Sequence, residues 1–353
     1  MKDNHLEPER RLLVVYLKEN SRSRTNTFLT DAIGRVFYWE RLGVPGLKNI
    51  KSTLTSLAKI PRGQKILVTS PNALLVIPLV VLWKGRPVLD MGWPLIDGVV
   101  VSRRQFGFLG FKAIVTYVTD FLAIHLASKV LLETEEQAIF VTKMFFVSRE
   151  KLRVIHTGFD ERRVQRSLLN RVEGIKNSRV KEIVFRGGNQ AEAGLNTLRE
   201  SLNLLSPSDL FRFKIISKDF TSPGFDPSVV KVLDSEVSDE ELFRQLYSAD
   251  ILLGQMSNHP RLKRTIPHKF FEAAFLRIPY VTSSSGLMNY FVRNKMVFGF
   301  EGGNPYSLLS VIRSIVEDQD ELDRRSARLY GWYLENASQE VLSNKLLSVL
   351  TER

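Results

Sequence analysis

The sequence predicts an α/β protein built from two Rossmann-like domains. The chain has 353 residues, which is long for one such domain. Short apolar runs alternate with amphipathic stretches in two successive series, the pattern of parallel sheets covered by helices. A charged stretch with little apolar periodicity, 161–180, separates the two series. We therefore expect an amino-terminal domain over 1–160, a linker over 161–180, a carboxy-terminal domain over 181–330, and terminal helices over 331–353.

The first series begins with an apolar run, 11–17, that leads into a polar loop and then a helix, the order that opens a Rossmann-type unit. The longest apolar stretch, 73–83, is interrupted by Pro78. It is shorter than the ~20 residues needed to span a bilayer, so we expect a buried helix there. Other runs predict strands over 65–69, 87–90, 129–132 and 152–156, and helices over 117–127 and 135–146.

The second series begins with a strand over 181–186 that ends at the glycine turn Gly187-Gly188. Ser238 and Glu241 have the spacing of a capping box at the start of a helix. Further runs predict strands over 211–216, 230–233, 251–254, 279–282 and 296–300, and helices over 195–205, 239–247, 322–335 and 339–350.

Composition limits the location and the partners of the protein. There is no cysteine, so disulfides and thiolate chemistry are excluded. The charged start of the chain lacks the apolar run of a signal peptide, and we expect a cytoplasmic protein. The net charge of +12 indicates an anionic partner, which is a nucleic acid, an acidic lipid or a phosphorylated substrate.

The distribution of the basic residues favours the last two of these partners. They occur in small groups without zinc-finger spacing or an aromatic nucleic-acid platform, so we expect no nucleic acid. The segment from Arg103 to Lys112 places three phenylalanines between cationic ends. Two interpretations stay open for it: it docks on an anionic membrane surface, or its aromatic side chains pack inward.

The most informative motif runs from Ile266 to Ala274 and on into the apolar run 278–282. Pro267 suits the first turn of a helix, and Lys269 follows where the backbone N–H groups already favour an anion. Glu272 comes one turn later. Two interpretations stay open: half of a phosphosugar site, or an ordinary amphipathic helix–strand turn.

The pattern Pro-x-Lys-x-x-Glu, followed by Ile278-Pro279 and a Ser/Thr-rich loop with Gly286, resembles the donor-site helix of retaining glycosyltransferases with the glycosyltransferase-B fold. The resemblance covers nearly the whole chain and is strong over 186–292. It implies two Rossmann-like domains with a central cleft, and terminal helices that pack back on the amino-terminal domain. It also implies a nucleotide-sugar donor, whose ribose hydroxyls Glu272 would hold.

The same resemblance implies which other residues bind the donor. Backbone groups of Ser284, Ser285 and Gly286 would contact the sugar or the diphosphate, beside Pro267 and His268 at the helix start. His268 has a second interpretation, as a solvated residue at a helix start.

Positive charge must neutralise the diphosphate, because the chain has no convincing Asp-x-Asp loop for a metal. Arg186, before Gly187 and Gly188, matches the family's phosphate arginine, although a solvated strand end is the alternative. The family's lysine is absent, since Ala193 precedes Gly194. Two interpretations stay open for Lys269 and Arg264: one of them substitutes for this lysine, or each is a surface charge. Arg264 also occupies the place of the first of the family's two glutamates. We expect no metal and no cofactor besides the nucleotide sugar.

Asp90 is the catalytic candidate of the amino-terminal domain. In the family this neighbourhood often carries a histidine–aspartate pair near the reacting sugar, and here Leu89 replaces the histidine. Asp90 either orients an acceptor hydroxyl or stabilises positive charge, or it caps the loop at Gly92. The polar residues after the first strand, Asn20, Ser21, Arg22 and Arg24, are weaker acceptor or phosphate candidates.

The sequence thus predicts a hexosyltransferase-like glycosyltransferase with Asp90, Arg186 and Lys269 in catalysis. It would act with retention and without metal on a lipid-linked or polysaccharide acceptor of the cell envelope, as a cytoplasmic protein peripheral to the membrane. One alternative is a catalytically impaired partner subunit, because the lysine before Gly194 and the histidine before Asp90 are missing. Another is a sugar-nucleotide epimerase of similar architecture, which needs carboxylate acid/base groups.

Overall fold

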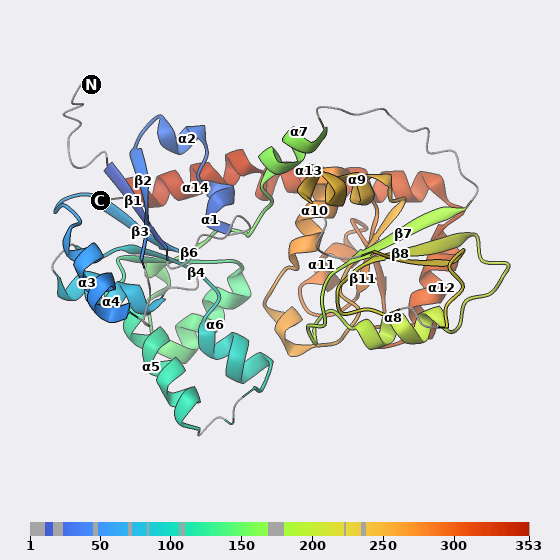
Figure 1. Ribbon diagram of the computed structural model, residues 1–353, viewed down its shortest axis with the longest axis horizontal. Coiled ribbons are helices and arrows are strands. Elements are labelled where there is room, and N and C mark those ends of the chain that lie inside the picture. The colour runs from blue at the N-terminus through green and yellow to red at the C-terminus, as the bar shows by residue number, and fades with distance from the viewer. Residues whose placement is uncertain are drawn as a thin grey trace. The chain divides into compact units, whose positions relative to one another are not determined.

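The structure is a computed structural model that describes residues 11–16, 24–44, 49–69, 73–82, 85–105, 107, 110–168, 180–221, 224–233 and 238–352. The chain divides into two compact units (Figure 1). Unit 1 comprises Met1–Gly158 and Gln339–Arg353, and unit 2 comprises Phe159–Ser338. Within the described ranges, no helix is both long enough and apolar enough to cross a membrane.

In its described residues, unit 1 contains a six-stranded parallel sheet with the strand order β2-β1-β3-β4-β5-β6. The strands are β1 (Arg11–Tyr16), β2 (Tyr38–Gly43), β3 (Lys65–Thr69), β4 (Val88–Gly92), β5 (Lys129–Leu132) and β6 (Leu152–Val154). The helices are α1 (Arg24–Phe28), α2 (Asp31–Gly34), α3 (Ile50–Ala58), η3 (Ala73–Leu75), α4 (Val76–Val81), the π-helix η4 (Asp97–Ser102), α5 (Phe111–Leu126), α6 (Glu135–Phe145), η5 (Arg149–Lys151) and α14 (Gln339–Thr351).

Both faces of this sheet are covered, as expected for parallel strands. Successive side chains of a strand point to opposite faces. Leu13 and Val15 accordingly join one core, with α5 and α6, whereas Leu12 and Val14 join another, with α1 and α14. Helix α14 is fixed to α1 by Ser343, whose hydroxyl donates to the carbonyl of Phe28.

Three elements of unit 1 differ from the sequence prediction. Strand β2 was not predicted because it lies at the sheet edge and most of its side chains are exposed, so it has no apolar run. Helix α5 begins at Phe111, six residues before the predicted 117. The apolar stretch 73–83 is only in part a buried helix: Val76 and Leu79 are buried, but Val81 is 66% exposed.

In its described residues, unit 2 also contains a six-stranded parallel sheet, with the order β12-β11-β10-β7-β8-β9. The strands are β7 (Lys181–Arg186), β8 (Phe211–Ile216), β9 (Val230–Leu233), β10 (Ile251–Leu253), β11 (Tyr280–Ser283) and β12 (Phe298–Phe300). The helices are α7 (Glu161–Leu168), α8 (Leu195–Leu202), α9 (Asp239–Ser248), η6 (Pro260–Lys263), α10 (His268–Leu276), α11 (Met288–Arg293), α12 (Pro305–Ile315) and α13 (Gln319–Asn336).

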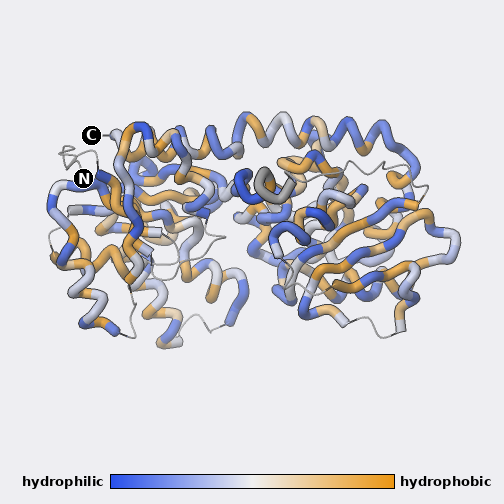
Figure 2. Tube along the Cα trace, turned by 45° about the horizontal axis from the view of Figure 1, so that its top comes forward, coloured by the Kyte–Doolittle hydropathy of each residue, from blue (hydrophilic) through white to orange (hydrophobic). Residues whose placement is uncertain are grey.

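The sheet of unit 2 is buried on both faces as well. Ile183 and Phe185 of β7 join the core formed with α8 and α12, and Val184 joins the core formed with α9, α10 and α13. The predicted cap of α9 is confirmed, since the Ser238 hydroxyl accepts from the Glu241 N–H at 3.2 Å. Hydrophobic and hydrophilic segments alternate along α13 (Figure 2), which packs on α10 through Trp332 and Phe270.

The division between the units can be compared with the predicted ranges. The predicted domain end at 160 lies two residues beyond Gly158. The first part of the predicted linker, 161–168, is helix α7, which is held to α9 by an ion pair between Arg163 and Asp239. Residues 169–179 lie outside the described residues. The predicted terminal range 331–353 is divided: its part up to Ser338 belongs to unit 2, and α14 belongs to unit 1.

Candidate functional site

The carboxyl ends of the strands of unit 2 gather the residues of the first candidate site, as is usual for parallel sheets. Arg186 ends β7, and its guanidinium donates two hydrogen bonds to the carboxylate of Glu272 on α10, one of them at 3.1 Å from Nε to Oε2. The side chain of Glu272 is 4% exposed and that of Arg186 is 22% exposed. The structure therefore joins two predicted site residues in one buried ion pair.

Burial alone would raise the pKa of Glu272, because it disfavours the charged carboxylate. The charges of Arg186 and His268 and the hydrogen bonds from Arg186 outweigh burial and hold the pKa below its ordinary value. The Nδ1 atom of His268 lies 3.9 Å from Oε1 of Glu272. Glu272 is therefore ionised at neutral pH, surrounded by basic groups.

Lys269 adds a third basic group at the same place. Its ammonium is shielded from solvent, although the residue as a whole is only half-buried, and within the described residues it has no hydrogen-bond partner. It lies over the ring of Phe185, 3.9 Å from the centroid. Burial and the charge of Arg186 lower the pKa of Lys269 to about 7. A shielded ammonium without a hydrogen-bond acceptor is suited to an anionic ligand.

The glycine turn after β7 leaves room beside this ammonium. A Cβ atom at Gly187 would lie 3.0 Å from Nζ of Lys269, and Gly187 has a φ of +156°, which favours glycine. A Cβ at Gly188 would lie 2.8 Å from a carboxylate oxygen of Asp219, which accepts from the N–H of Asn189. The backbone conformation thus favours glycine at position 187, and a side chain at position 188 would displace the Asp219 carboxylate.

Helix α10 begins at His268, one residue after the proline that the sequence placed in its first turn. Pro267 is the N-cap residue, with φ −61° and ψ 141°. Its side chain makes no capping hydrogen bond, and its carbonyl accepts from the N–H of Phe270 at 3.0 Å.

The loop after β11 carries the remaining predicted donor residues. Ser285 and Ser283 share a hydrogen bond of 2.8 Å, and the Ser283 hydroxyl donates to the carbonyl of Ser257. The Oγ atom of Ser284 points toward Gly299 of the neighbouring strand. Gly286 has a φ of +54°, and a Cβ there would collide with the carbonyl of Leu262. The loop therefore holds its shape through its own side chains.

The position at which the resembled family carries its phosphate lysine has no room for a long side chain in this protein. Ala193 is buried in the core beside α8. The following Gly194 lies against the backbone of Met256 and Ser257, where a Cβ would come within 2.8 Å. Lys269 supplies a cation at the glycine turn from α10 instead. Arg264 is partly buried at the end of η6.

In unit 1 the carboxyl ends of the strands gather a second polar cluster. Asp90 on β4 is fully buried, and its two oxygens accept from Arg24 Nε and from the Thr25 hydroxyl, each at 2.7 Å. Arg24 also donates to the carbonyl of Ile155, while its Nη2 atom has no hydrogen-bond partner in the described part of the chain. Asp90 is placed to hold Arg24. Asn20, Ser21 and Arg22 lie outside the described residues.

Glu133 was missed by the sequence analysis. It follows β5, and its Oε1 atom accepts from the hydroxyl of Thr157 at 2.9 Å. Its Oε2 atom is buried without a partner among the described residues, and Oε1 lies beside Gly92. His156 contacts the Glu133 carbonyl, and burial lowers its pKa to about 4. Glu133 stands in an acidic run typical of a helix start, so its sequence context does not mark it as a site residue.

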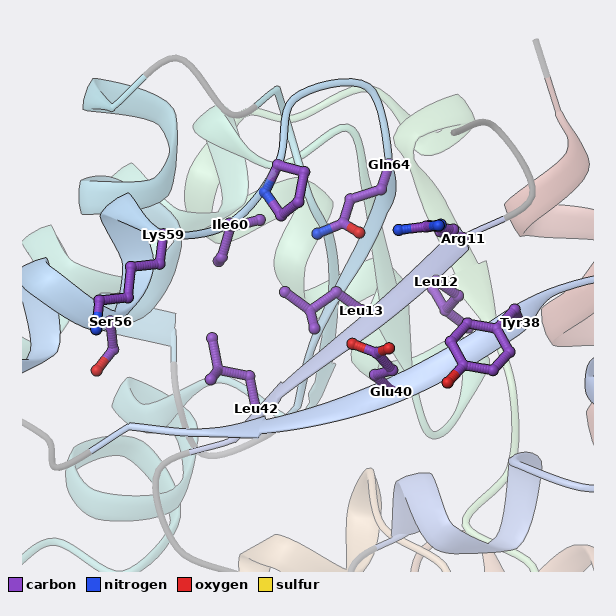
Figure 3. A pocket seen from close by; sticks show the side chains of 11 residues that line it. Arg11, Leu12, Leu13, Tyr38, Glu40, Leu42, Ser56, Lys59, Ile60 and Gln64 are labelled. Carbon is purple, nitrogen blue, oxygen red and sulfur yellow. The ribbon is translucent and has the colours of Figure 1, made fainter. Parts of the chain in front are cut away.

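A cavity of about 180 Å³ also lies in unit 1, between the edge of the sheet and α3 (Figure 3). It contains none of the predicted site residues. Its walls come mainly from the amino-terminal half of β1, from β2 and from the turn before β3: Arg11, Leu13, Tyr38, Glu40, Leu42, Ile60 and Gln64. Among the residues described in both units, no group of three His, Asp or Glu side chains could hold a metal ion. The expectation of a metal-independent reaction stays a prediction.

No family model matches the chain, and no curated protein matches it in sequence. Among solved structures, it is similar to HepE from Anabaena in complex with UDP-glucose, with 12% identity and a TM-score of 0.67, over 97% of this chain and 99% of that one. It is also similar to sucrose-phosphate synthase from Thermosynechococcus elongatus, with 10% identity and a TM-score of 0.67, over 97% of this chain and 98% of that one. A third similar structure is WaaG, a glycosyltransferase involved in lipopolysaccharide biosynthesis. It has 13% identity and a TM-score of 0.65, over 97% of this chain and 100% of that one. The chain therefore has the glycosyltransferase-B fold, and the predicted fold class is confirmed.

Proposed function

We propose that this protein is a glycosyltransferase that moves a sugar from a nucleotide-sugar donor to an acceptor. The observation that carries the proposal is the basic cluster at the carboxyl edge of the unit 2 sheet. Arg186 and the shielded ammonium of Lys269, which comes from the first turn of α10, present positive charge at the Gly187-Gly188 turn. Two of the structures similar in fold have bound UDP-glucose or UDP, which supports the same class of donor.

The cluster fits the chemistry of this transfer. The bond between the anomeric carbon and the diphosphate oxygen breaks, and the leaving diphosphate gains negative charge. Arg186 and Lys269 would neutralise that charge. Glu272 would accept hydrogen bonds from the ribose hydroxyls, as the resemblance implies, while the phosphates compete with it for the guanidinium of Arg186. Ser284, Ser285 and Gly286 would contact the sugar or the diphosphate through backbone groups.

Unit 1 would bind the acceptor. Arg24 Nη2 and Glu133 Oε2, polar atoms without a partner in the described residues, are the groups that we assign to acceptor hydroxyls or phosphates. The net charge of +12 favours a lipid-linked or polysaccharide acceptor with anionic groups. Retention of configuration, hexosyl transfer and metal independence complete the proposal. The anomeric configuration of the product, read by NMR, and transfer in the presence of a chelator test these points.

Replacing Glu272 with alanine is expected to abolish nucleotide binding. A thermal-shift series with UDP, GDP, ADP, CMP and TDP should first identify the base that stabilises the wild-type protein. A ligand at about 100 times its Kd adds ~2.7 kcal/mol to the free energy of unfolding. Glu272→Ala should lose that stabilisation together with transfer, because the ribose hydroxyls lose their acceptor.

Glu241→Ala is the matched control, since this glutamate pairs with an arginine, Arg244, on the surface of the same unit. It should keep both nucleotide binding and transfer. Unchanged nucleotide affinity in Glu272→Ala would refute the site assignment. Nucleotide binding by the wild type without turnover on any acceptor would instead favour a catalytically impaired partner subunit.

Lys269 is expected to make the stability of the protein depend on pH. Its pKa is about 7 in the folded protein, against an ordinary value of 10.5. Between these values the unfolded chain binds the proton and the folded protein does not. The free energy of unfolding should therefore rise with pH across this window, by up to ~1.4 kcal/mol per pH unit from this group. Denaturation at pH 7 and at pH 9 measures the slope.

In Lys269→Met this pH dependence of the free energy of unfolding should vanish. Lys263 is exposed, and Lys263→Met should keep the pH dependence. Nucleotide binding near pH 8 should draw a proton onto Lys269, which calorimetry in buffers of different ionisation enthalpy detects. Equal pH slopes in the wild type and in Lys269→Met would show that the ammonium is not shielded as described.

A further inference from the structure

Helix α5 of unit 1 exposes a stripe of large apolar side chains (Figure 1 shows the helix). We call these residues the α5 stripe: Phe111, Ile114, Val115, Val118 and Leu122. Phe111 is 81% exposed, and the others are between 38% and 53% exposed. Such a concentration of exposed apolar side chains on one helix marks an interaction surface.

The spacing of the stripe places it on one face. At about 100° per residue, the five positions fall within an arc of roughly 100°, and the helix is ~24 Å long. The opposite face is buried through Ala113, Ala123 and Ile124. Asp120, also buried, accepts from the N–H of Ile96 at 2.8 Å, which fixes the helix to the rest of unit 1. The stripe is therefore held outward by a rigid support.

The segment that leads into the stripe and forms most of it carries charges of one sign. Residues 99–119 contain Arg103, Arg104 and Lys112 and no acidic residue. The acidic residue of α5, Asp120, is fully buried. An apolar helix face with cations at its end is the arrangement that inserts into the interface of an anionic bilayer, where the side chains enter the acyl region and the cations meet the lipid headgroups.

A second copy of the chain fits the stripe less well. A stable protein–protein interface buries about 800 Å² per partner and uses about 20–30 residues on each side. The α5 stripe offers five. A bilayer needs no matching surface, so a narrow apolar stripe with flanking cations is sufficient for it.

We infer that the α5 stripe docks the protein on anionic membranes, with Arg104 and Lys112 against the lipid headgroups. Membrane docking is one of the two interpretations that the sequence leaves open for the segment 103–112, of which Phe106 and Phe108 lie outside the described residues. Phe111 of that segment is the first residue of the α5 stripe. This inference is independent of the proposed transferase activity, because lipid binding requires neither donor nor acceptor.

Co-sedimentation with vesicles tests it. The wild-type protein should bind vesicles of phosphatidylcholine with phosphatidylglycerol, and bind pure phosphatidylcholine much less. Val115→Ser/Val118→Ser should weaken binding to the anionic vesicles by about tenfold or more, because two apolar side chains no longer enter the bilayer. Arg104→Gln/Lys112→Gln should weaken binding at low salt and make it less sensitive to added salt, because fewer charges are left for the ions to screen.

Leu334→Ser is the matched control, because Leu334 is 46% exposed, as is Val115, but lies on α13 of unit 2. It should bind vesicles as the wild type does. Circular dichroism and chemical denaturation check that each variant stays folded. Vesicle binding that is unchanged in Val115→Ser/Val118→Ser, or absent in the wild type, would overturn the inference. A dimer that the stripe variant converts to a monomer would assign the stripe to a second copy instead.

Discussion

Arg186→Ala is expected to lower the free energy of unfolding by about 3–5 kcal/mol, because it leaves the buried carboxylate of Glu272 without its guanidinium. It is also expected to slow transfer by about 10²–10³-fold, because the leaving diphosphate loses a positive group. Chemical denaturation measures the first effect. Initial rates with the donor identified by thermal shift measure the second.

A double variant separates the two effects. In Arg186→Met/Glu272→Gln neither charge remains, so most of the lost stability should return, whereas transfer should not recover. Arg244→Ala removes a guanidinium from an exposed pair with Glu241 and should cost less than ~1 kcal/mol. An Arg186→Ala variant as stable as the wild type would contradict the buried ion pair seen here.

Asp90→Ala is expected to have a comparable effect on unit 1. Arg24 is 8% exposed, and without Asp90 its charge would be buried with only the carbonyl of Ile155 as a described acceptor. We expect a loss of about 3–5 kcal/mol in the free energy of unfolding. Nucleotide binding by the folded protein should be unchanged, because the donor residues lie in unit 2.

The same variant distinguishes the two interpretations of Asp90. If Asp90 acts by holding Arg24, then Arg24→Met/Asp90→Leu should regain stability, and Thr25→Val should lower both stability and transfer in part. If Asp90 itself meets the acceptor, Asp90→Ala should lose transfer while its stability stays near that of the wild type. Denaturation curves and transfer rates, measured on the same preparations, decide between them.

The elements that could be predicted from the sequence are those with their own apolar signal. Strands β3, β5, β7 and β8 are buried runs, and their predicted bounds agree with the structure. Strand β2 lies at the edge of the sheet, and four of its six residues are exposed, so its pattern resembles a loop. The start of α5 was predicted too late because the apolar side chains of its first turns are exposed. An amphipathic pattern locates a helix only where the apolar side chains are buried and the polar ones are exposed.

The candidate site could be predicted residue by residue but not as an arrangement. The motif around α10 indicated Lys269 and Glu272, and the glycine turn indicated Arg186. Their pairing depends on a side chain from a strand that meets a helix 86 positions later, which local spacing does not encode. Two other features also depend on contacts between residues that are distant in the sequence. They are the shielding of the Lys269 ammonium from solvent and the hydrogen bond between Asp90 and Thr25.

The membership of α14 in unit 1 has a consequence for the order of folding. Unit 1 begins before unit 2 and is completed after it, so the polypeptide leaves unit 1, builds the whole of unit 2 and then returns. During synthesis, unit 2 possesses all of its residues while one face of the unit 1 sheet still lacks Leu342 and Leu346. The half of the protein that is made first therefore reaches its native state last, and until then its open sheet face is the surface most in need of protection from aggregation.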